Sequence, residues 1–200
     1  MSEHYFAADP RSVEKRLPVD VSVWGHDLRL QSASGVFSAG RLDPGTAVLF
    51  RETEHPTRPG TYLDFGCGYG VIACALASVV PEAEVWAVDV NERALALCRT
   101  NADTLGVGGR VQVVTPAEVP DDVAFDEIWS NPPIRIGKPA LHALLSTWLA
   151  RLAPGGRAVL VVSKNLGADS LQRWIADQGF GCSRLGSAKG FRVLEVRPPR

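Results

Sequence analysis

The sequence has few residues of the kinds that bind metals or form disulfide bonds. Its 200 residues include only four cysteines and four histidines. The cysteines, at positions 67, 74, 98 and 182, form no CxxC pair, and no histidine has a partner at metal-ligand spacing. We therefore expect no metal site and four reduced, mostly buried thiols.

The sequence also has no apolar run long enough to cross a bilayer. The longest mostly apolar stretch, residues 71–80, is about half the roughly 20 residues that a membrane helix needs. The first residues, MSEHYF, are polar and show no basic-then-apolar signal pattern. Contents of 46% hydrophobic and 22% charged residues are those of an ordinary globular protein. We expect a cytoplasmic protein with no membrane association.

Charge is distributed unevenly along the chain, although the formal net charge is only −1. Residues 61–130 carry 3 basic and 11 acidic side chains, a net charge of −8. Residues 131–200 carry 11 basic and 3 acidic side chains, a net charge of +8. The carboxyl-terminal third is therefore the candidate surface for an anionic partner such as nucleic acid. Solvated arginines on helix faces are the alternative interpretation.

The first 60 residues predict an extension rather than an independent domain. Residues 19–31 alternate apolar and polar side chains on both sides of a turn at 24–27, which is typical of a β-hairpin. Asp43 can cap a helix that begins at Pro44, and residues 55–60 read as a linker. We expect residues 1–60 to form a flap or brace on a domain at 61–200, because 60 residues bury little core alone.

From residue 61 the sequence alternates strand-like and helix-like segments, the pattern of a parallel sheet covered on both faces. We expect strands at 61–66, 84–90, 110–115, 125–131, 157–163, 181–186 and 191–197, with helices near 69–80, 92–105, 138–152 and 168–178. Only four residues separate the last two strands, so these should form an antiparallel hairpin.

Two motifs close apolar strand-like runs: DFGCGYG at residues 64–70 and NPP at residues 131–133. Both should lie at the carboxyl edge of the sheet, where ligands of open α/β sheets bind. The glycines have GxGxG spacing, whereas the NAD fingerprint requires GxGxxG, which disfavours a nicotinamide cofactor. A glycine turn before a helix still directs backbone N–H groups at a ligand.

Two acidic residues flank the glycine turn. Asp64 opens it, and Asp89 follows Gly70 by 19 residues at the end of the next strand. A carboxylate at that position can accept hydrogen bonds from both hydroxyls of a ribose. The alternative is that both acids are ordinary residues of strand-end turns.

The NPP motif offers two hydrogen-bond acceptors side by side. An exocyclic amine on a base or an amide is a poor nucleophile, because its lone pair is delocalised. The Asn131 side-chain oxygen and the Pro132 carbonyl can accept its two N–H groups and localise that lone pair. A stiff turn after a strand is the structural alternative.

In order and spacing, residues 64–70, Asp89, residues 125–133 and residues 152–156 resemble the class I S-adenosylmethionine-dependent methyltransferases. Residues 35–38 and 42–46 resemble the small methyltransferase domain of ribosomal RNA guanine-N2 methyltransferases. This resemblance implies a Rossmann-like α/β fold with a seven-stranded, mostly parallel sheet and an antiparallel last strand, preceded by a hairpin and a helix.

The resemblance also implies an S-adenosylmethionine site. It implies that Asp89 binds the ribose, that Val90 flanks the adenine, and that Asn131 lies at the methyl end of the cofactor. The loop that holds the methionine part would consist of Asp64, Phe65, Gly66, Cys67, Gly68 and Gly70. Relatives often have an acidic residue at position 117 to hold the adenine amine. This chain has Ala117 there, so Glu118 or backbone groups would have to replace it.

One departure concerns the acceptor. Ile134 follows Pro133, where many amino-methylating relatives have an aromatic residue that stacks on the target base, a contact worth about 1 to 3 kcal/mol per base. Phe37 could hold the base instead, or it could be a core residue. We expect the rim of the site to contact nucleic acid phosphates through Arg135, Lys138, Lys164 and Lys189.

The resulting hypothesis is an S-adenosylmethionine-dependent N-methyltransferase with Asn131 and Pro132 as catalytic residues and guanine N2 of ribosomal RNA as acceptor. Three alternatives remain at this point. The acceptor is a protein glutamine, the acceptor is a small molecule, or the chain is a non-catalytic module that binds cofactor and RNA.

Overall fold

The structure, a computed structural model, describes residues 14–199. A hairpin and a short helix precede an alternating α/β domain. The strands are β1 (Arg16–Val23), β2 (His26–Ala33), β3 (Gly60–Phe65), β4 (Ala83–Val88), β5 (Val111–Val114), β6 (Phe125–Ser130), β7 (Leu152–Ser163), β8 (Gly181–Ala188) and β9 (Phe191–Arg197). The helices are α1 (Pro44–Arg51), α2 (Val71–Val79), α3 (Glu92–Thr104), α4 (Lys138–Leu149) and α5 (Ala168–Asp177).

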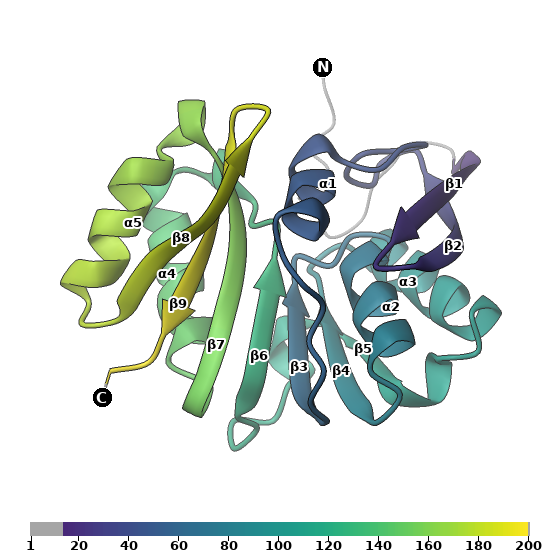
Figure 1. Cartoon of the computed structure of the whole chain (residues 1–200). Coiled ribbons are helices and arrows are strands. Elements are labelled where there is room, and N and C mark those ends of the chain that lie inside the picture. Colours follow the sequence, from purple (N-terminus) through teal and green to yellow (C-terminus); the bar gives the residue numbers. More distant parts are fainter. Residues whose placement is uncertain (1–13, 200) are drawn as a thin grey trace.

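Seven strands form one sheet in the order β5-β4-β3-β6-β7-β9-β8 (Figure 1). Neighbours from β5 to β7 are parallel, and β9 is antiparallel to both β7 and β8. The strands β1 and β2 form a separate antiparallel hairpin. The predicted fold class is confirmed, including the antiparallel last strand.

Successive side chains of each central strand point to opposite faces of the sheet, and each face packs into its own hydrophobic core. Tyr62, Trp129 and Val159 face the core that contains α1, α2 and α3. Their neighbours in sequence, such as Leu63 and Ile128, face the core beneath α4 and α5. The central strands β3 and β6 are therefore apolar along most of their length, since both of their faces are buried.

The described part of the amino-terminal extension is tied to this domain by polar side chains of α3. The Asn101 side chain accepts from the Gln31 backbone N–H (2.7 Å) and donates to the Gln31 carbonyl (2.9 Å) and the Tyr69 carbonyl (2.8 Å). Arg93 donates to the Ser34 carbonyl at 2.8 Å. The division of the chain near residue 60 stays a prediction.

Trp24 fixes α1 from the other side. Its indole N–H donates to the carbonyls of Phe50 (3.2 Å) and Thr53 (3.0 Å) at the end of α1. Its ring meets those of Phe50 and Trp129 edge-on, with centroids 5.0 and 5.5 Å apart. The hairpin, α1 and β6 therefore form one packed unit.

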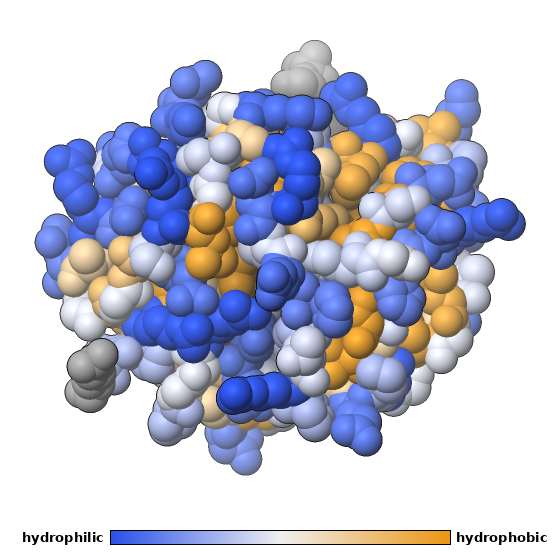
Figure 2. Space-filling model, viewed as in Figure 1, coloured by the Kyte–Doolittle hydropathy of each residue, from blue (hydrophilic) through white to orange (hydrophobic). Residues whose placement is uncertain are grey.

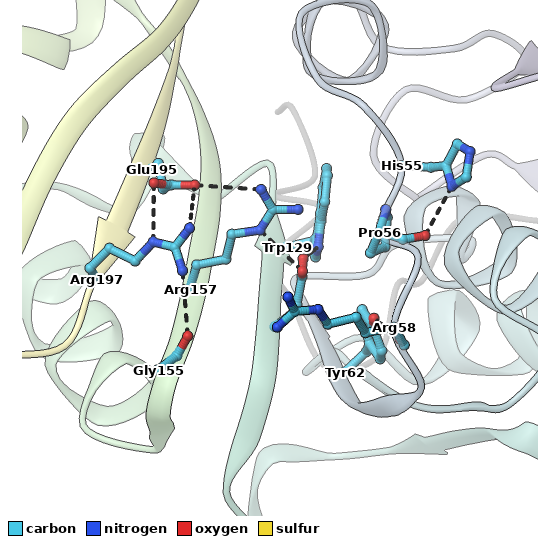
Figure 3. Close-up of polar contacts among 10 residues, drawn as sticks. His55, Pro56, Arg58, Tyr62, Trp129, Gly155, Arg157, Glu195 and Arg197 are labelled. Carbon is cyan, nitrogen blue, oxygen red and sulfur yellow. Dashed lines mark hydrogen bonds and ion pairs between the residues drawn. The ribbon is translucent and has the colours of Figure 1, made fainter.

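Below α1 in Figure 1, ion pairs cover the front of the sheet. Arg157 on β7 pairs with Glu127 (3.1 Å) on β6 and Glu195 (3.4 Å) on β9. Figure 3 shows Arg157 between Glu195 and Trp129, with Arg197 bonded to the far side of Glu195. These pairs join three neighbouring strands on the same face as α1, in the part of that face below the helix.

One predicted boundary is wrong. The helix expected at 138–152 ends at Leu149, and β7 begins at Leu152 rather than at residue 157. Residues Pro154–Gly156, which indicate a break in the sequence, lie inside β7 at a register shift opposite Phe125 and Glu127. A bulge accommodates the extra residues without ending the strand.

Within residues 14–199, no helix is long and apolar enough to span a membrane. The same residues contain no cluster of three or more side chains suited to hold a metal ion.

Candidate active site

A cavity of about 500 Å³ opens at the carboxyl edge of the sheet. Its volume lies within the roughly 300–1,000 Å³ of small-molecule sites. The walls come from the glycine turn after β3, the residues after β4 and β6, the second half of α4, the loop before α1, and the end of β7 and start of β9. Members of the wall include Val36, Phe37, Ser38, Arg41, Asp43, Phe65, Gly66, Gly68, Asp89, Val90, Asn91, Pro116, Asn131, Pro132, Pro133, Ile134, Arg135, Leu144, Trp148, Ser163 and Phe191.

The glycine turn is shaped by backbone hydrogen bonds to β4 and by Asp89. The N–H groups of Gly66 and Cys67 donate to the Val88 carbonyl at 2.8 and 3.1 Å. The Gly68 N–H donates to Asp89 Oδ2 at 2.9 Å. Gly66, Gly68 and Gly70 all have positive φ (73°, 55° and 87°), a conformation that strongly favours glycine.

Two carboxyl groups flank this turn, Asp64, which is fully buried, and Asp89, which is half-buried and lines the cavity. Asp64 Oδ2 accepts from the Ala73 N–H at 3.0 Å, whereas Asp64 Oδ1 is buried and has no hydrogen-bond partner among the described residues. Burial raises the pKa of the Asp64 carboxyl from its ordinary 3.8 to about 8. Burial also raises the pKa of Asp89, against the opposing effect of backbone hydrogen bonds from Asn91 and Gly68.

Asn131 lies directly after β6, and its side-chain amide is held by the first turn of α1. Asn131 Nδ2 donates to Asp43 Oδ1 at 2.7 Å and to Thr46 Oγ1 at 3.0 Å. The nitrogen end is therefore occupied. Next to it, the Pro132 carbonyl accepts from the Ile134 N–H at 2.8 Å, which leaves one of its two lone pairs for a further donor.

The sequence matches a known family over most of this structure. Residues 27–195 match the profile of the methyltransferase small domain. The chain belongs to this family. It is an S-adenosylmethionine-dependent methyltransferase.

Relatives of this methyltransferase include proteins of similar and of about double length. YbxB of Bacillus subtilis, an uncharacterized protein, is 32% identical over 200 residues, which span 98% of this chain and 99% of YbxB. Ribosomal RNA small subunit methyltransferase C of Pasteurella multocida is 35% identical over 178 residues, which span 86% of this chain but 52% of that protein. This chain thus covers about half of methyltransferase C.

A solved structure shares the fold. The T. thermophilus 16S rRNA N2 G1207 methyltransferase, in complex with AdoMet and guanosine, superposes with a TM-score of 0.80 at 24% identity. The match covers 96% of this chain and 52% of the T. thermophilus chain. At this identity the likeness concerns the fold.

The cavity of this methyltransferase fits S-adenosylmethionine, whose methionine part carries an ammonium and a sulfonium. The Asp89 carboxyl, which lines the cavity, and the unpartnered Asp64 Oδ1, which lies behind its wall, both favour a positively charged ligand there. The Val90 side chain lines the cavity and is 48% exposed, so its apolar surface is available for contact with an adenine ring.

Several residues predicted for the cofactor do not line the cavity. Asp64, Cys67 and Gly70 lie behind its wall, where Asp64 bonds to α2 and Gly70 precedes that helix. Ala117 and Glu118 also lie outside the lining, and the neighbouring Pro116 takes their place. The reason is local, because Glu118 turns back to accept from the backbone N–H and hydroxyl of Thr115 at 2.7 and 2.8 Å.

Of the residues predicted to bind substrate, some line the cavity and others lie outside it. Phe37, Pro133, Ile134 and Arg135 line the cavity. The exposed lysines are outside it, Lys138 at the start of α4, Lys164 after β7 and Lys189 in the β8–β9 turn. The Lys164 N–H donates to the Gly190 carbonyl at 2.8 Å, so two of these segments meet. Figure 2 shows hydrophilic residues over α5 and over β8, which is one strand of the β8–β9 hairpin.

Sequence reasoning missed several residues of the wall. Asp43 was predicted as a helix cap, and it does accept from the N–H groups of Gly45 and Thr46, but it also bonds to Asn131. Phe191 at the start of β9 and Ser163 at the end of β7 face each other in the sheet and line the cavity. The hairpin pattern of the last two strands is a signal that could have placed Phe191 at this edge.

Proposed function

We propose that this methyltransferase transfers a methyl group to an exocyclic amine, and that the acceptor is N2 of guanine in ribosomal RNA. The observation that carries the proposal is the orientation of Asn131. Its Nδ2 is bonded to Asp43 and Thr46, so its Oδ1 is the atom left to accept a hydrogen bond in the cavity.

The clamp acts on the acceptor nitrogen. Asn131 Oδ1 and the Pro132 carbonyl accept one N–H each, which withdraws the lone pair from conjugation and directs it across the cavity. S-adenosylmethionine, when bound, supplies a methyl group that is already activated by its sulfonium. The chain therefore contributes orientation and electrostatics, and the methylated nitrogen loses one proton to water.

Aromatic side chains outside the NPP motif provide a surface on which the ring of the acceptor base can stack. Ile134 has no ring, but Phe37 and Phe191 both line the cavity and are half-buried. Phe191 lies beside the start of α1, where a Cβ added to Gly45 would come within 3.0 Å of its ring. Stacking on such a ring contributes about 1 to 3 kcal/mol per base.

The charges around the mouth support a nucleic acid acceptor. Arg135 lies in the wall, and Lys138, Lys164 and Lys189 extend from segments that follow β6 and β7 or join β8 to β9. Cations in such positions bind phosphates and fix the register of an RNA without reading its sequence. The names of methyltransferase C and of the T. thermophilus enzyme support ribosomal RNA and guanine N2 in particular.

The proposal is tested with isotope-labelled S-adenosylmethionine and four acceptors: small-subunit ribosomal RNA, assembled small subunits, total protein and a low-molecular-weight cell extract. The RNA is digested to nucleosides, and the labelled nucleoside is identified by mass spectrometry. We expect labelled N2-methylguanosine, suppressed by excess S-adenosylhomocysteine. Label in protein glutamine, or in small molecules alone, would replace the RNA proposal with one of the two other acceptor classes.

A further inference from the structure

We infer that Asp43 and Thr46 are positioning residues that set which end of the Asn131 amide faces the acceptor. This inference rests on the proposed function, because it assumes that Asn131 Oδ1 accepts from the acceptor amine. It also gives the amino-terminal extension a role in catalysis, since both residues belong to the first turn of α1 rather than to the sheet.

The geometry brings three donors to one oxygen. Asp43 Oδ1 accepts from the Gly45 N–H (2.8 Å), the Thr46 N–H (3.1 Å) and Asn131 Nδ2 (2.7 Å). The Thr46 hydroxyl, which is buried, lies 3.0 Å from the same Asn131 nitrogen. The cap of α1 and the orientation of Asn131 therefore depend on one carboxylate.

A carboxamide has two ends of nearly equal size, so its surroundings decide its orientation. An ionised carboxylate can only accept hydrogen bonds, so Asp43 excludes the orientation in which the Asn131 oxygen faces it. The wrong orientation would present N–H groups to the acceptor amine, where two donors would meet. The charged hydrogen bond also polarises the amide and makes Asn131 Oδ1 a stronger acceptor.

The position of α1 makes this contact possible. Trp24 holds the end of the helix through the carbonyls of Phe50 and Thr53. Gly45 leaves room at its start, because an added Cβ would come within 2.9 Å of Asp43 Oδ1 and 3.0 Å of Phe191. The helix start can thus approach β6 and β9 closely enough for a side chain of aspartate length to reach Asn131.

Two substitutions separate positioning from helix capping. Asp43→Ser keeps a good N-cap but is too short to reach Asn131. Asp43→Asn keeps an oxygen of the right length but removes the charge. We expect an unchanged melting temperature for both variants, and S-adenosylhomocysteine affinity, measured by calorimetry, within about threefold of wild type. We expect kcat to fall about 10- to 100-fold in Asp43→Ser and less than about fivefold in Asp43→Asn, on the scale of a lost transition-state hydrogen bond.

A double-mutant cycle shows whether the effect passes through Asn131. In an Asn131→Ala background, Asp43→Ser should reduce kcat by less than about twofold, because the side chain that it orients is gone. In labelled protein, the NMR signals of the Asn131 side-chain amide should shift in Asp43→Ser and exchange faster with water. Independent, multiplying losses or unchanged amide signals would overturn the inference. An Asn131→Ala protein with normal turnover would instead overturn the proposed function.

Discussion

At the scale of single residues, Asp64 and Asn131 differ in how their polar atoms are satisfied. The Asn131 nitrogen has two acceptors, whereas one oxygen of Asp64 is buried with none among the described residues. A buried, unpartnered carboxyl group favours its neutral form, which is the reason for the raised pKa. The protonation state of the Asp64 carboxyl should therefore respond to pH and to a cation bound in the cavity.

We predict that Asp64 makes the cofactor-free protein less stable as pH rises. Its pKa is about 8 in the fold against an ordinary 3.8, so between these values the folded protein retains a proton that the unfolded chain releases. The free energy of unfolding then falls with increasing pH, by at most about 1.4 kcal/mol per pH unit from this group. Urea denaturation at several pH values measures the slope. Asp64→Asn should remove this contribution, and parallel curves for the two proteins would contradict it.

We further predict that cofactor binding releases a proton. The positive charge of a ligand bound in the neighbouring cavity stabilises the Asp64 carboxylate through the wall, so near neutral pH the group should ionise as the ligand binds. Calorimetric titration with S-adenosylhomocysteine in buffers of different ionisation enthalpy counts the released protons. We expect up to about one proton for wild type and a smaller number for Asp64→Asn. Heats that do not depend on the buffer would exclude this coupling.

Local sequence signals located the motifs that line the cavity but not the residues that contact them. The glycine turn, Asp89 and the NPP motif each follow a recognisable strand, so their common edge could be predicted. Asp43 and Asn131 are 88 residues apart, and their contact depends on how α1 packs on the sheet. Glu118 lies outside the cavity lining because it turns back to bond with Thr115, and its proposed role toward the adenine stays a prediction.

At the scale of elements, the alternation of apolar segments predicted the sheet, and the amino-terminal pattern predicted the hairpin and α1. The end of α4 could not be predicted, because Leu152 continues the apolar helical spacing but pairs with Phe125 as part of β7. At this position, pairing of β7 with β6 across a β-bulge determines the structure, and the helical spacing of apolar residues does not. The sequence likewise contains no direct sign that α3 binds the hairpin through Asn101.

We predict that Asn101→Ala detaches the hairpin β1–β2 from α3. The change leaves the Gln31 N–H and two carbonyls without their partner, at a cost of about 2 to 4 kcal/mol. Chemical denaturation measures the loss, and hydrogen exchange of the Gln31 amide should accelerate. Thr104→Ala, at an exposed position of the same helix, is the matched control and should stay within about 0.5 kcal/mol of wild type. Equal stability of the two variants would contradict the predicted role.

At the scale of the whole molecule, the acidic segment 61–130 is followed by the basic segment 131–200. The basic carboxyl-terminal third provides Arg135 in the cavity wall and Lys138, Lys164 and Lys189 on segments close in sequence to wall residues. Arg58 lies before β3, at the opposite edge of the sheet. The rim and the far edge are therefore suited to a matched comparison of charge effects.

We predict that Lys164→Ala and Lys189→Ala weaken RNA binding without changing its sequence preference. Each lost phosphate contact should reduce the slope of log K against log salt by about 1. Binding to a labelled RNA fragment over a range of salt concentrations measures this slope. Arg58→Ala should leave the slope unchanged, and an equal effect of Arg58→Ala would show that only overall charge matters.

The central claim is that Asn131 holds the acceptor amine beside the cofactor rather than the cofactor itself. The most direct test measures S-adenosylhomocysteine affinity and methyl transfer for wild type and Asn131→Ala in the same preparations. We predict cofactor affinity within about threefold and methyl transfer reduced by about 100-fold or more, as for loss of a group that acts in the transition state. Normal transfer, or a loss of transfer matched by an equal loss of cofactor binding, would contradict the claim.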